Sequence, residues 1–124
     1  MLLKVTATDP CKEVLEKYED VRLAFAKLLN FIAPWFYQVL DFHFKMKLGK
    51  DIVTLLISSP KEFYKALVEV GGEPYAEMLI EVLDRKLREL KLMEPTMPSL
   101  TYIIKYSGAR GEICKLLLKI AEKT

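Results

Sequence analysis

The stretch that decides the fold is residues 34–49, PWFYQVLDFHFKMKLG. Proline is favoured at the first position of a helix and glycine just after its end, so this stretch predicts a helix over residues 34–48. At about 100° per residue, the charged and amide side chains Gln38, Asp41 and Lys45 share one narrow stripe of that helix. Apolar side chains cover most of the remaining circumference, and a helix so apolar must be buried on most of its sides. We therefore expect it to be either the central helix of the domain or part of a subunit interface.

The segment before this stretch predicts one long amphipathic helix over residues 9–33. Asp9 is a good N-cap, and Pro10 suits the first helical position. Apolar residues then recur at helical spacing as far as Ile32, with acidic residues on the other face. The helix should end or kink before Pro34, because a proline disfavours helical geometry in the residue that precedes it.

Further helices are predicted downstream, over residues 59–70, 74–92 and 112–123. Ser59 and Glu62 form a capping box, in which each side chain pairs an otherwise free backbone amide. A pair of glycines follows the end of this capped helix, as is common at helix C-termini. These signals make the second half of the chain mainly helical.

Three segments leave the choice between helix and strand open. Residues 2–7 alternate apolar and polar side chains, which suits an edge strand. Residues 52–57 are β-branched and apolar, and here we favour a short helix, whereas residues 100–106 suit either structure. The fold class that follows is all-α: a compact bundle of about five or six helices in a single domain over residues 1–124, with short strands allowed in these three segments.

The composition excludes several classes of protein. A chain of 124 residues fits one domain, and 52% hydrophobic with 29% charged residues is too apolar for a disordered chain and too charged for a membrane protein. The longest uncharged run, residues 28–40, is shorter than the roughly 20 apolar residues that cross a bilayer. The N-terminal residues lack the apolar run of a signal peptide. We expect a cytoplasmic protein that does not enter a membrane.

The amide and cysteine residues indicate what kind of organism the protein comes from and the redox state of its cysteines. Asn30 and Gln38 are the only amides, whereas lysine and glutamate are plentiful, which is typical of hyperthermophile proteins and predicts a thermophilic source. Cys11 and Cys114 stand near opposite ends of the chain. In an ordinary cytosol we expect them to be reduced and buried, and a disulfide between them is the alternative in a hyperthermophile cytosol. No CxxC or CxxH spacing supports a metal site.

No set of residues predicts catalysis. His43 is the only histidine, Asp41 lies off its helical face, and the chain has no GxSxG motif. Most carboxylates alternate with lysines on faces expected to be solvated. We therefore expect no enzyme activity, no metal ion and no cofactor.

The apolar helix over residues 34–48 is the expected binding surface. Its apolar arc is wider than one small domain needs, and we assign Trp35, Phe36, Val39 and Phe42 to an interface. Identical chains associate most often as two-fold symmetric dimers. The sequence thus predicts a non-enzymatic protein-interaction domain that forms a homodimer, with another protein partner also allowed.

The alternative function is an accessory protein that binds nucleic acid. Its candidate contacts are basic residues of two helices together with a glycine and an arginine in the turn before the last helix: Arg85, Arg88, Gly108, Arg110 and Lys115. Free amides at a helix start, with an arginine beside them, can hold a phosphate. The net charge of +2, from 19 basic and 17 acidic residues, lacks the basic excess of a dedicated nucleic-acid binder. This function therefore ranks second.

Residues 42–90 resemble a known family. The order HFKMKLG, then SSPKEFYKALVEVGG, then AEMLIEVLDRKL is similar to that of the small archaeal helical domains grouped as Nitrosopumilus output domains. The matching positions are Pro60, Phe63, Ala66, Leu67, Gly71 and Gly72. The resemblance covers less than half of the chain, and it implies a helical fold and an archaeal source. Because these positions are caps, turns and core, it brings no catalytic residues with it.

Overall fold

The fold is all-α, as the sequence predicts. The computed structural model describes residues 9–34, 36–107 and 110–123. Over these residues it contains eight α-helices, one π-helical segment and no strand. In chain order the elements are α1 (Pro10–Glu16), α2 (Tyr18–Ile32), α3 (Phe36–Leu48), α4 (Ile52–Ser58), α5 (Pro60–Gly71), α6 (Glu73–Glu89), α7 (Leu100–Tyr102), η2 (Ile103–Ser107) and α8 (Arg110–Lys123).

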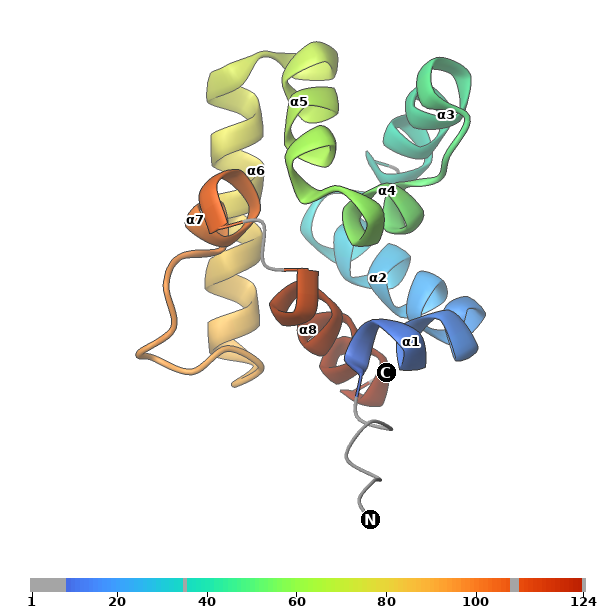
Figure 1. The fold of residues 1–124 in the computed structure, drawn as a ribbon. Helices are drawn as coiled ribbons and strands as arrows, with labels where there is room; N and C mark the ends of the chain where they lie inside the picture. The colour runs from blue at the N-terminus through green and yellow to red at the C-terminus, as the bar shows by residue number, and fades with distance from the viewer. Residues whose placement is uncertain (1–8, 35, 108–109, 124) are drawn as a thin grey trace.

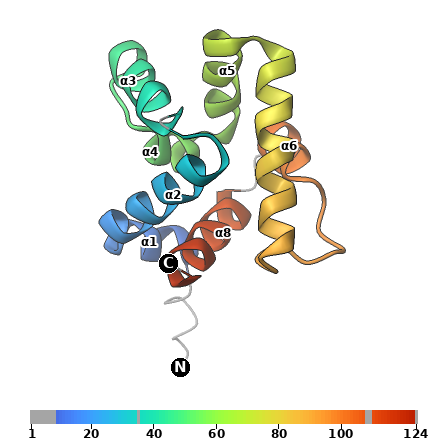
Figure 2. The ribbon, with the colours of Figure 1, turned by 180° about the vertical axis from the view of Figure 1, so that it is seen from behind.

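The helices pack in two groups that α4 joins. α8 lies against α1 and α2, and α5 lies antiparallel beside α6 (Figure 1). α4 contacts both α5 and α8. α3 stands at the edge of the molecule against α2, α4 and α5, and the view from behind shows it on the opposite side from α6 (Figure 2). The expectation of a central position for this helix is therefore wrong, whereas an interface on its outer side stays open.

One cluster of buried apolar side chains runs through the molecule, and every α-helix contributes to it. α3 contributes Leu40 and Phe44, and the Phe44 ring meets the Phe63 ring of α5 edge-on, with centroids 5.9 Å apart. No polar or charged side chain of the described residues is buried. The amphipathic stripes of the sequence therefore account for the core.

The long first helix is interrupted, which the sequence does not indicate. Lys17 leaves helical geometry (φ −109°, ψ 29°), so α1 ends at Glu16 and α2 begins at Tyr18. Neither proline nor glycine stands there, but α1 packs against α8. The Tyr18 hydroxyl meanwhile reaches Asp51 and Thr54 at the start of α4. The prediction of one continuous helix over residues 9–33 is wrong, since the chain bends at Lys17, which lets α1 and α2 both pack against α8 while Tyr18 contacts α4.

Two of the three ambiguous segments are helical. Residues 52–57 lie in α4, which Asp51 caps by accepting a hydrogen bond from the Thr54 amide at 2.8 Å. Five apolar residues of α4 are buried, so its apolar run reflects a core on several sides of a helix rather than a sheet. Residues 100–106 lie in α7 and η2. The helix favoured for residues 52–57 is confirmed, the strand alternative is wrong for both segments, and residues 2–7 lie outside the described residues.

Several predicted helix ends are confirmed, but α6 ends at Glu89 instead of residue 92 and α8 begins at Arg110 instead of residue 112. The Ser59 half of the capping box is present, whereas the Ser59 amide donates to the Leu55 carbonyl instead of to Glu62. Ser59 Oγ accepts a hydrogen bond from the Glu62 amide at 3.3 Å at the start of α5. Gly49 after α3 and Gly72 after α5 have φ values of 68° and 90°, which glycine adopts without strain. There are more helices than the expected five or six because α1 and α2 are separate and because residues 100–102 form the additional helix α7.

A disulfide bond joins the two ends of the described chain. Cys11 of α1 and Cys114 of α8, 103 residues apart, are bonded to each other. Packing of α1 against α8 brings the two cysteines together, and sequence spacing cannot show that contact. The reduced state favoured from the sequence is therefore wrong for this structure, which has the alternative pairing.

Candidate functional site

The outer face of α3 carries a stripe of exposed apolar residues. Val39, Phe42 and Met46 are 44%, 62% and 71% exposed. They follow each other at intervals of three and four residues, so they lie on one side of the helix. Leu40 and Phe44 lie on the buried side. We call Val39, Phe42 and Met46 the α3 stripe.

The four residues assigned to an interface from the sequence have different outcomes. Val39 and Phe42 belong to the α3 stripe. Trp35 lies outside the described residues, and α3 begins at Phe36, whose side chain is also not described. Met46, which was not among the four, continues the stripe by one turn. Helical spacing from Val39 and Phe42 identifies it.

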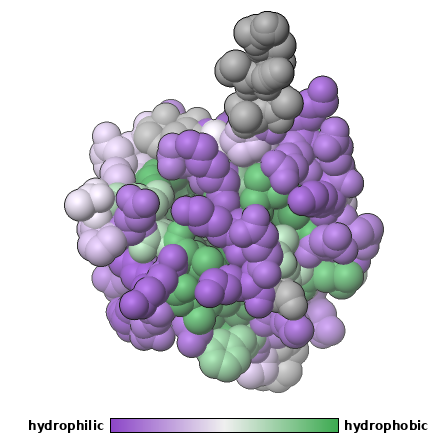
Figure 3. Space-filling view, turned by 90° about the horizontal axis from the view of Figure 1, so that it is seen from below, coloured by the Kyte–Doolittle hydropathy of each residue, from purple (hydrophilic) through white to green (hydrophobic). Residues whose placement is uncertain are grey.

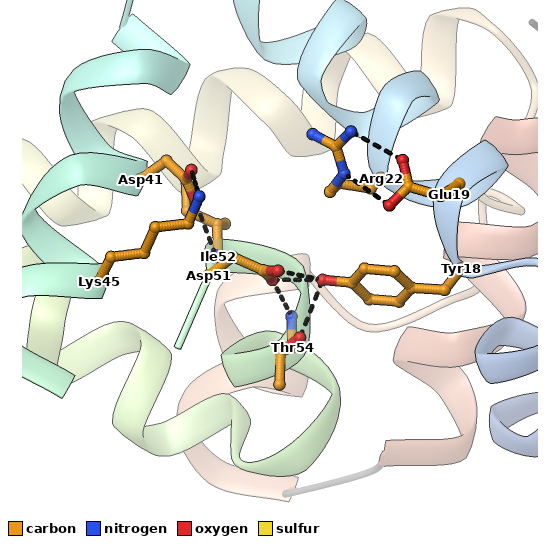
Figure 4. Close-up of polar contacts among 8 residues, drawn as sticks. All are labelled: Tyr18, Glu19, Arg22, Asp41, Lys45, Asp51, Ile52 and Thr54. Carbon is orange, nitrogen blue, oxygen red and sulfur yellow. Dashed lines mark hydrogen bonds and ion pairs between the residues drawn. The ribbon is translucent and has the colours of Figure 1, made fainter. Parts of the chain in front are cut away.

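Polar contacts hold the inner side of α3 on α4. Asp41 Oδ1 accepts a hydrogen bond from the Ile52 amide at 3.3 Å, and Asp41 Oδ2 lies 3.0 Å from the Lys45 ammonium (Figure 4). The Asp41 carboxylate therefore satisfies a free amide at the N-terminus of α4, as a capping group does. Together with the buried Leu40 and Phe44, this contact sets the rotation of α3 that turns its stripe outward.

A polar cluster of Tyr18, Asp51 and Thr54 lies beside this contact. The Tyr18 hydroxyl donates a hydrogen bond to the Asp51 carboxylate and lies 2.8 Å from Thr54 Oγ1 (Figure 4). Burial, followed by the hydrogen bond to Asp51, raises the pKa of Tyr18 above its usual value. Burial opposes ionisation of Asp51, but the hydrogen bonds from Tyr18 and Thr54 outweigh it and lower the pKa of Asp51. At neutral pH the cluster is therefore a protonated phenol bound to a carboxylate.

This cluster has the properties of a structural joint. Tyr18 keeps its proton and Asp51 already accepts from several donors, so neither is poised as a base near neutral pH. The cluster connects α2 to the N-cap of α4. In the part of the chain that the structure describes, no group of histidine, cysteine, aspartate and glutamate side chains could hold a metal ion. Among the aromatic rings of the described residues, the His43 ring contacts that of Phe42, and the two ring centroids lie 6.0 Å apart.

The basic residues assigned to nucleic-acid contact are largely engaged within the protein. Arg88 donates to carbonyl oxygens of the segment after α6, and Arg110 Nε donates to the Ile57 carbonyl at 2.7 Å. Arg85 lies 4.0 Å from a Glu81 oxygen, and Lys115 lies 3.7 Å from one of Glu112, both as ion pairs. Gly108 lies outside the described residues.

Sequence reasoning missed a second apolar surface, a groove between α2, α6 and α8. It has a volume of about 350 Å³ and is lined by apolar residues and by Lys27, Lys86 and Lys123. Phe31 at its edge is 69% exposed. Seen from below, the molecule shows patches of apolar side chains among hydrophilic ones (Figure 3). In the sequence, the spacing of Phe31 four residues after Lys27 was the available signal for this groove. The lysines of α6 and α8 come close to Phe31 only in the tertiary structure.

Comparison of the chain with known protein families, curated proteins and solved structures found no match. The resemblance of residues 42–90 to the Nitrosopumilus output domains therefore stays a prediction. Among the residues described, no helix is both long enough and apolar enough to cross a membrane.

Proposed function

We propose that this protein is a non-enzymatic interaction domain that self-associates through the α3 stripe as a two-fold symmetric dimer. The observation that carries the proposal is the exposure of Val39, Phe42 and Met46 in one continuous row. Contiguous exposed apolar surface on a small protein commonly marks an interaction site. An isologous dimer covers the same row on both copies at once.

The spacing of the stripe supports packing of one helix against another. Residues 39, 42 and 46 follow the alternation of three and four that forms the seam of paired helices. Trp35 lies four residues before Val39 in the sequence and continues the same spacing. Two copies of α3 can therefore interleave these side chains along a shared seam.

The charges beside the stripe do not oppose self-association strongly. Lys45 lies 3.0 Å from Asp41, and Lys47 lies 3.8 Å from Glu69, so each lysine has a carboxylate of its own chain nearby. Burial of an exposed large apolar side chain contributes about 1.5–3 kcal/mol, whereas association costs roughly 4–15 kcal/mol in lost freedom. For a stripe of this size we expect a dissociation constant on the order of micromolar.

The disulfide bears on the proposed location. Ordinary cytosols keep cysteines reduced, but cytosolic proteins of hyperthermophiles are an exception. A cytoplasmic location for a chain with the Cys11–Cys114 bond therefore goes together with a thermophilic source, and the scarcity of amides supports the same source. We keep both as part of the proposal, with an archaeal origin.

The nucleic-acid alternative has no comparable support. Arg88 and Arg110 both donate to backbone carbonyls, and a phosphate would have to compete with these contacts. No observation brings the proposed basic residues onto one surface with aromatic rings between them, as binding of single strands requires.

The experiment is sedimentation velocity over low to high micromolar concentrations of the wild type, Phe42→Glu and Phe31→Glu. Phe42 and Phe31 are similarly exposed, at 62% and 69%, on different surfaces, so the second variant is a matched control. We expect dimers for the wild type and Phe31→Glu, and monomers for Phe42→Glu. A wild type that stays monomeric at the highest concentration contradicts the proposal, as does a dimer that Phe31→Glu disrupts and Phe42→Glu does not.

The fluorescence of Trp35, the only tryptophan of the chain, supplies an independent readout. If the seam includes Trp35, its emission maximum shifts to shorter wavelength as the wild type associates. The emission of Phe42→Glu should then not change with concentration. A concentration-independent emission from a wild type that does dimerise would remove Trp35 from the proposed interface.

A further inference from the structure

The groove between α2, α6 and α8 combines an apolar floor with charge of a single sign. Its apolar lining includes Leu28, Phe31 and Leu90, and its ionisable lining residues are Lys27, Lys86 and Lys123. No carboxylate of the described residues lines it. Among the described residues, lysine is the only type of charged residue at this apolar groove. Charge complementarity therefore favours an occupant with an apolar face and acidic residues next to that face.

The three lysines come from three different helices and converge at this groove. Lys27 lies on α2, Lys86 lies near the end of α6, and Lys123 ends α8. The Lys86 ammonium lies 4.5 Å from the centroid of the Phe31 ring, a cation–π contact that also positions Phe31 at the edge. Lys86 has an ion pair with Glu89 at 3.7 Å. Among the described residues no carboxylate lies within ion-pair distance of Lys27 or Lys123.

The groove continues along α2 and α8 into a larger hollow. Ala24 and Lys27 line both, and the second hollow, between α1, α2 and α8, has a volume of about 780 Å³. Ala26 and Ala121 form part of its floor, but the carboxylates Glu13, Asp20 and Glu122 also line it. The lining in which lysine is the only charged residue described is therefore confined to the groove itself. Leu23 and Phe31 are both exposed on α2, and eight residues of helix separate them by about 12 Å. That distance matches anchors two turns apart on a partner helix lying in a groove.

We propose that this groove docks an amphipathic helix of a partner protein whose apolar stripe is flanked by glutamate or aspartate where it lies over Lys27, Lys86 and Lys123. The groove is open and its anchors are exposed, so it suits a helix that covers it rather than an enclosed small molecule. Residues 1–8 of this chain contain one lysine and no carboxylate, so they do not supply the complementary charge. The aliphatic floor also offers little to stacked bases.

The inference is independent of the α3 stripe, which lies on another side of the molecule. In solution the acidic helix would be steered by the lysines and held by Phe31 and the floor. Steering by exposed charges is screened by salt. The affinity should therefore fall as salt rises, while the dependence on Phe31 should persist at high salt.

The experiment measures fluorescence anisotropy of two labelled peptides with the full chain. Both peptides are helices of about five turns with the same leucine and phenylalanine stripe. One carries glutamate on both flanks of the end that is to lie over Lys27, Lys86 and Lys123, the other carries lysine at the same positions, and the remaining flanks of both are uncharged. We expect the acidic peptide to bind the wild type and the basic peptide not to bind. Phe31→Ala should weaken binding about tenfold or more, and each single Lys→Gln change at positions 27, 86 and 123 by roughly two- to fivefold.

Charge reversal supplies the matched control. The triple variant Lys27→Glu, Lys86→Glu, Lys123→Glu should lose the acidic peptide and gain the basic one. A second triple variant, Lys47→Glu, Lys61→Glu, Lys65→Glu, changes the net charge of the protein by the same amount, but at positions on α3 and α5. It should bind the acidic peptide like the wild type. Circular dichroism of each variant checks that it is folded.

Four results overturn the proposal. They are failure of the wild type to bind either peptide, equal binding of both peptides, equal loss in the two triple variants, and displacement of the acidic peptide by a single-stranded oligonucleotide. If Phe31→Glu instead abolishes self-association of the protein, the groove is an interface between copies, and the proposed partner is wrong.

Discussion

The guanidinium Nε of Arg88 lies 2.6 Å from Oδ1 of Asp84, one helical turn earlier on α6. The other nitrogens of Arg88 donate to carbonyl oxygens beyond the helix, including those of Glu94 and Met97 at 3.0 and 3.1 Å. Asp84 Oδ2 in turn accepts from the Leu100 amide at 2.7 Å, at the start of α7. These two side chains therefore fasten the connection between α6 and α7.

Arg88→Lys should destabilise the protein by about 2–3 kcal/mol, although the charge is kept. A lysine ammonium cannot reproduce the planar fork that reaches a carboxylate and several carbonyls together. The measurement is the urea midpoint with its slope. Arg85→Lys is the matched control, because Arg85 has only an exposed ion pair at 4.0 Å, and it should change stability by less than about 0.5 kcal/mol. Equal effects of the two substitutions would show that the loop contacts of Arg88 contribute nothing.

Reduction of the Cys11–Cys114 bond should lower the free energy of unfolding by about 3–5 kcal/mol. The bond closes a loop of 103 residues, and a cross-link over so long a loop restricts the unfolded chain strongly. Urea unfolding with and without a reductant measures the difference. The Cys11→Ala, Cys114→Ala double variant should resemble the reduced protein and be insensitive to the reductant. A wild type whose midpoint ignores the reductant would contradict the presence of the bond in solution.

The Tyr18–Asp51 contact should make stability depend on pH in the acid range. The pKa of Asp51 is lowered in the folded protein, whereas an unfolded aspartate titrates near about 3.9. Its contribution is therefore fully present above that value and is lost as pH falls through the lower folded pKa. Tyr18→Phe removes a hydrogen bond to the carboxylate and should cost about 1–2 kcal/mol at neutral pH.

Asp51→Asn tests the origin of this pH dependence. The variant should unfold more easily at pH 7 but lose part of the decline in stability below about pH 4. Urea midpoints measured across the acid range for the wild type and the variant provide the comparison. Parallel curves for the two proteins would assign the acid sensitivity to other carboxylates.

Two glycines should respond in opposite ways to replacement by alanine. Gly72 has a φ of 90°, which costs an alanine about 1–2 kcal/mol. Gly111 lies in α8 with nothing within 4 Å of an added Cβ, so Gly111→Ala should stabilise the protein by about 0.5–1 kcal/mol. Thermal unfolding of the two variants checks both signs. A stabilising Gly72→Ala would mean that the turn between α5 and α6 differs from the one described.

Local signals predict the parts of this structure that depend on a few neighbouring residues. The amide of Glu62 finds Ser59, Gly49 closes α3, and Asp84 pairs with Arg88 four residues later. Each of these contacts is complete within one turn of the chain, so spacing alone indicates it. Two of the four predicted interface residues, Val39 and Phe42, are exposed on one face of α3. Their shared face could be predicted because helical periodicity shows which residues lie on the same side of a helix.

Other features could not be predicted, because they join residues far apart in the sequence. The break at Lys17 accompanies packing of both α1 and α2 on α8, and the Cys11–Cys114 bond depends on the contact of α1 with α8. Arg88 was assigned to an external surface, yet the segment after α6 folds back onto it. Periodicity describes the faces of a helix but not the direction that the chain takes after the helix ends.

The amino-acid sequence by itself determined the all-α class, most of the helix ends and the apolar character of α3. Only the tertiary structure decided that α3 stands at the edge, that Cys11 is bonded to Cys114, and that Lys27, Lys86 and Lys123 meet at one groove. Helix formation follows from hydrogen bonds and side-chain spacing within a few residues. The arrangement of helices follows from which apolar faces bury each other, and that depends on the whole chain at once.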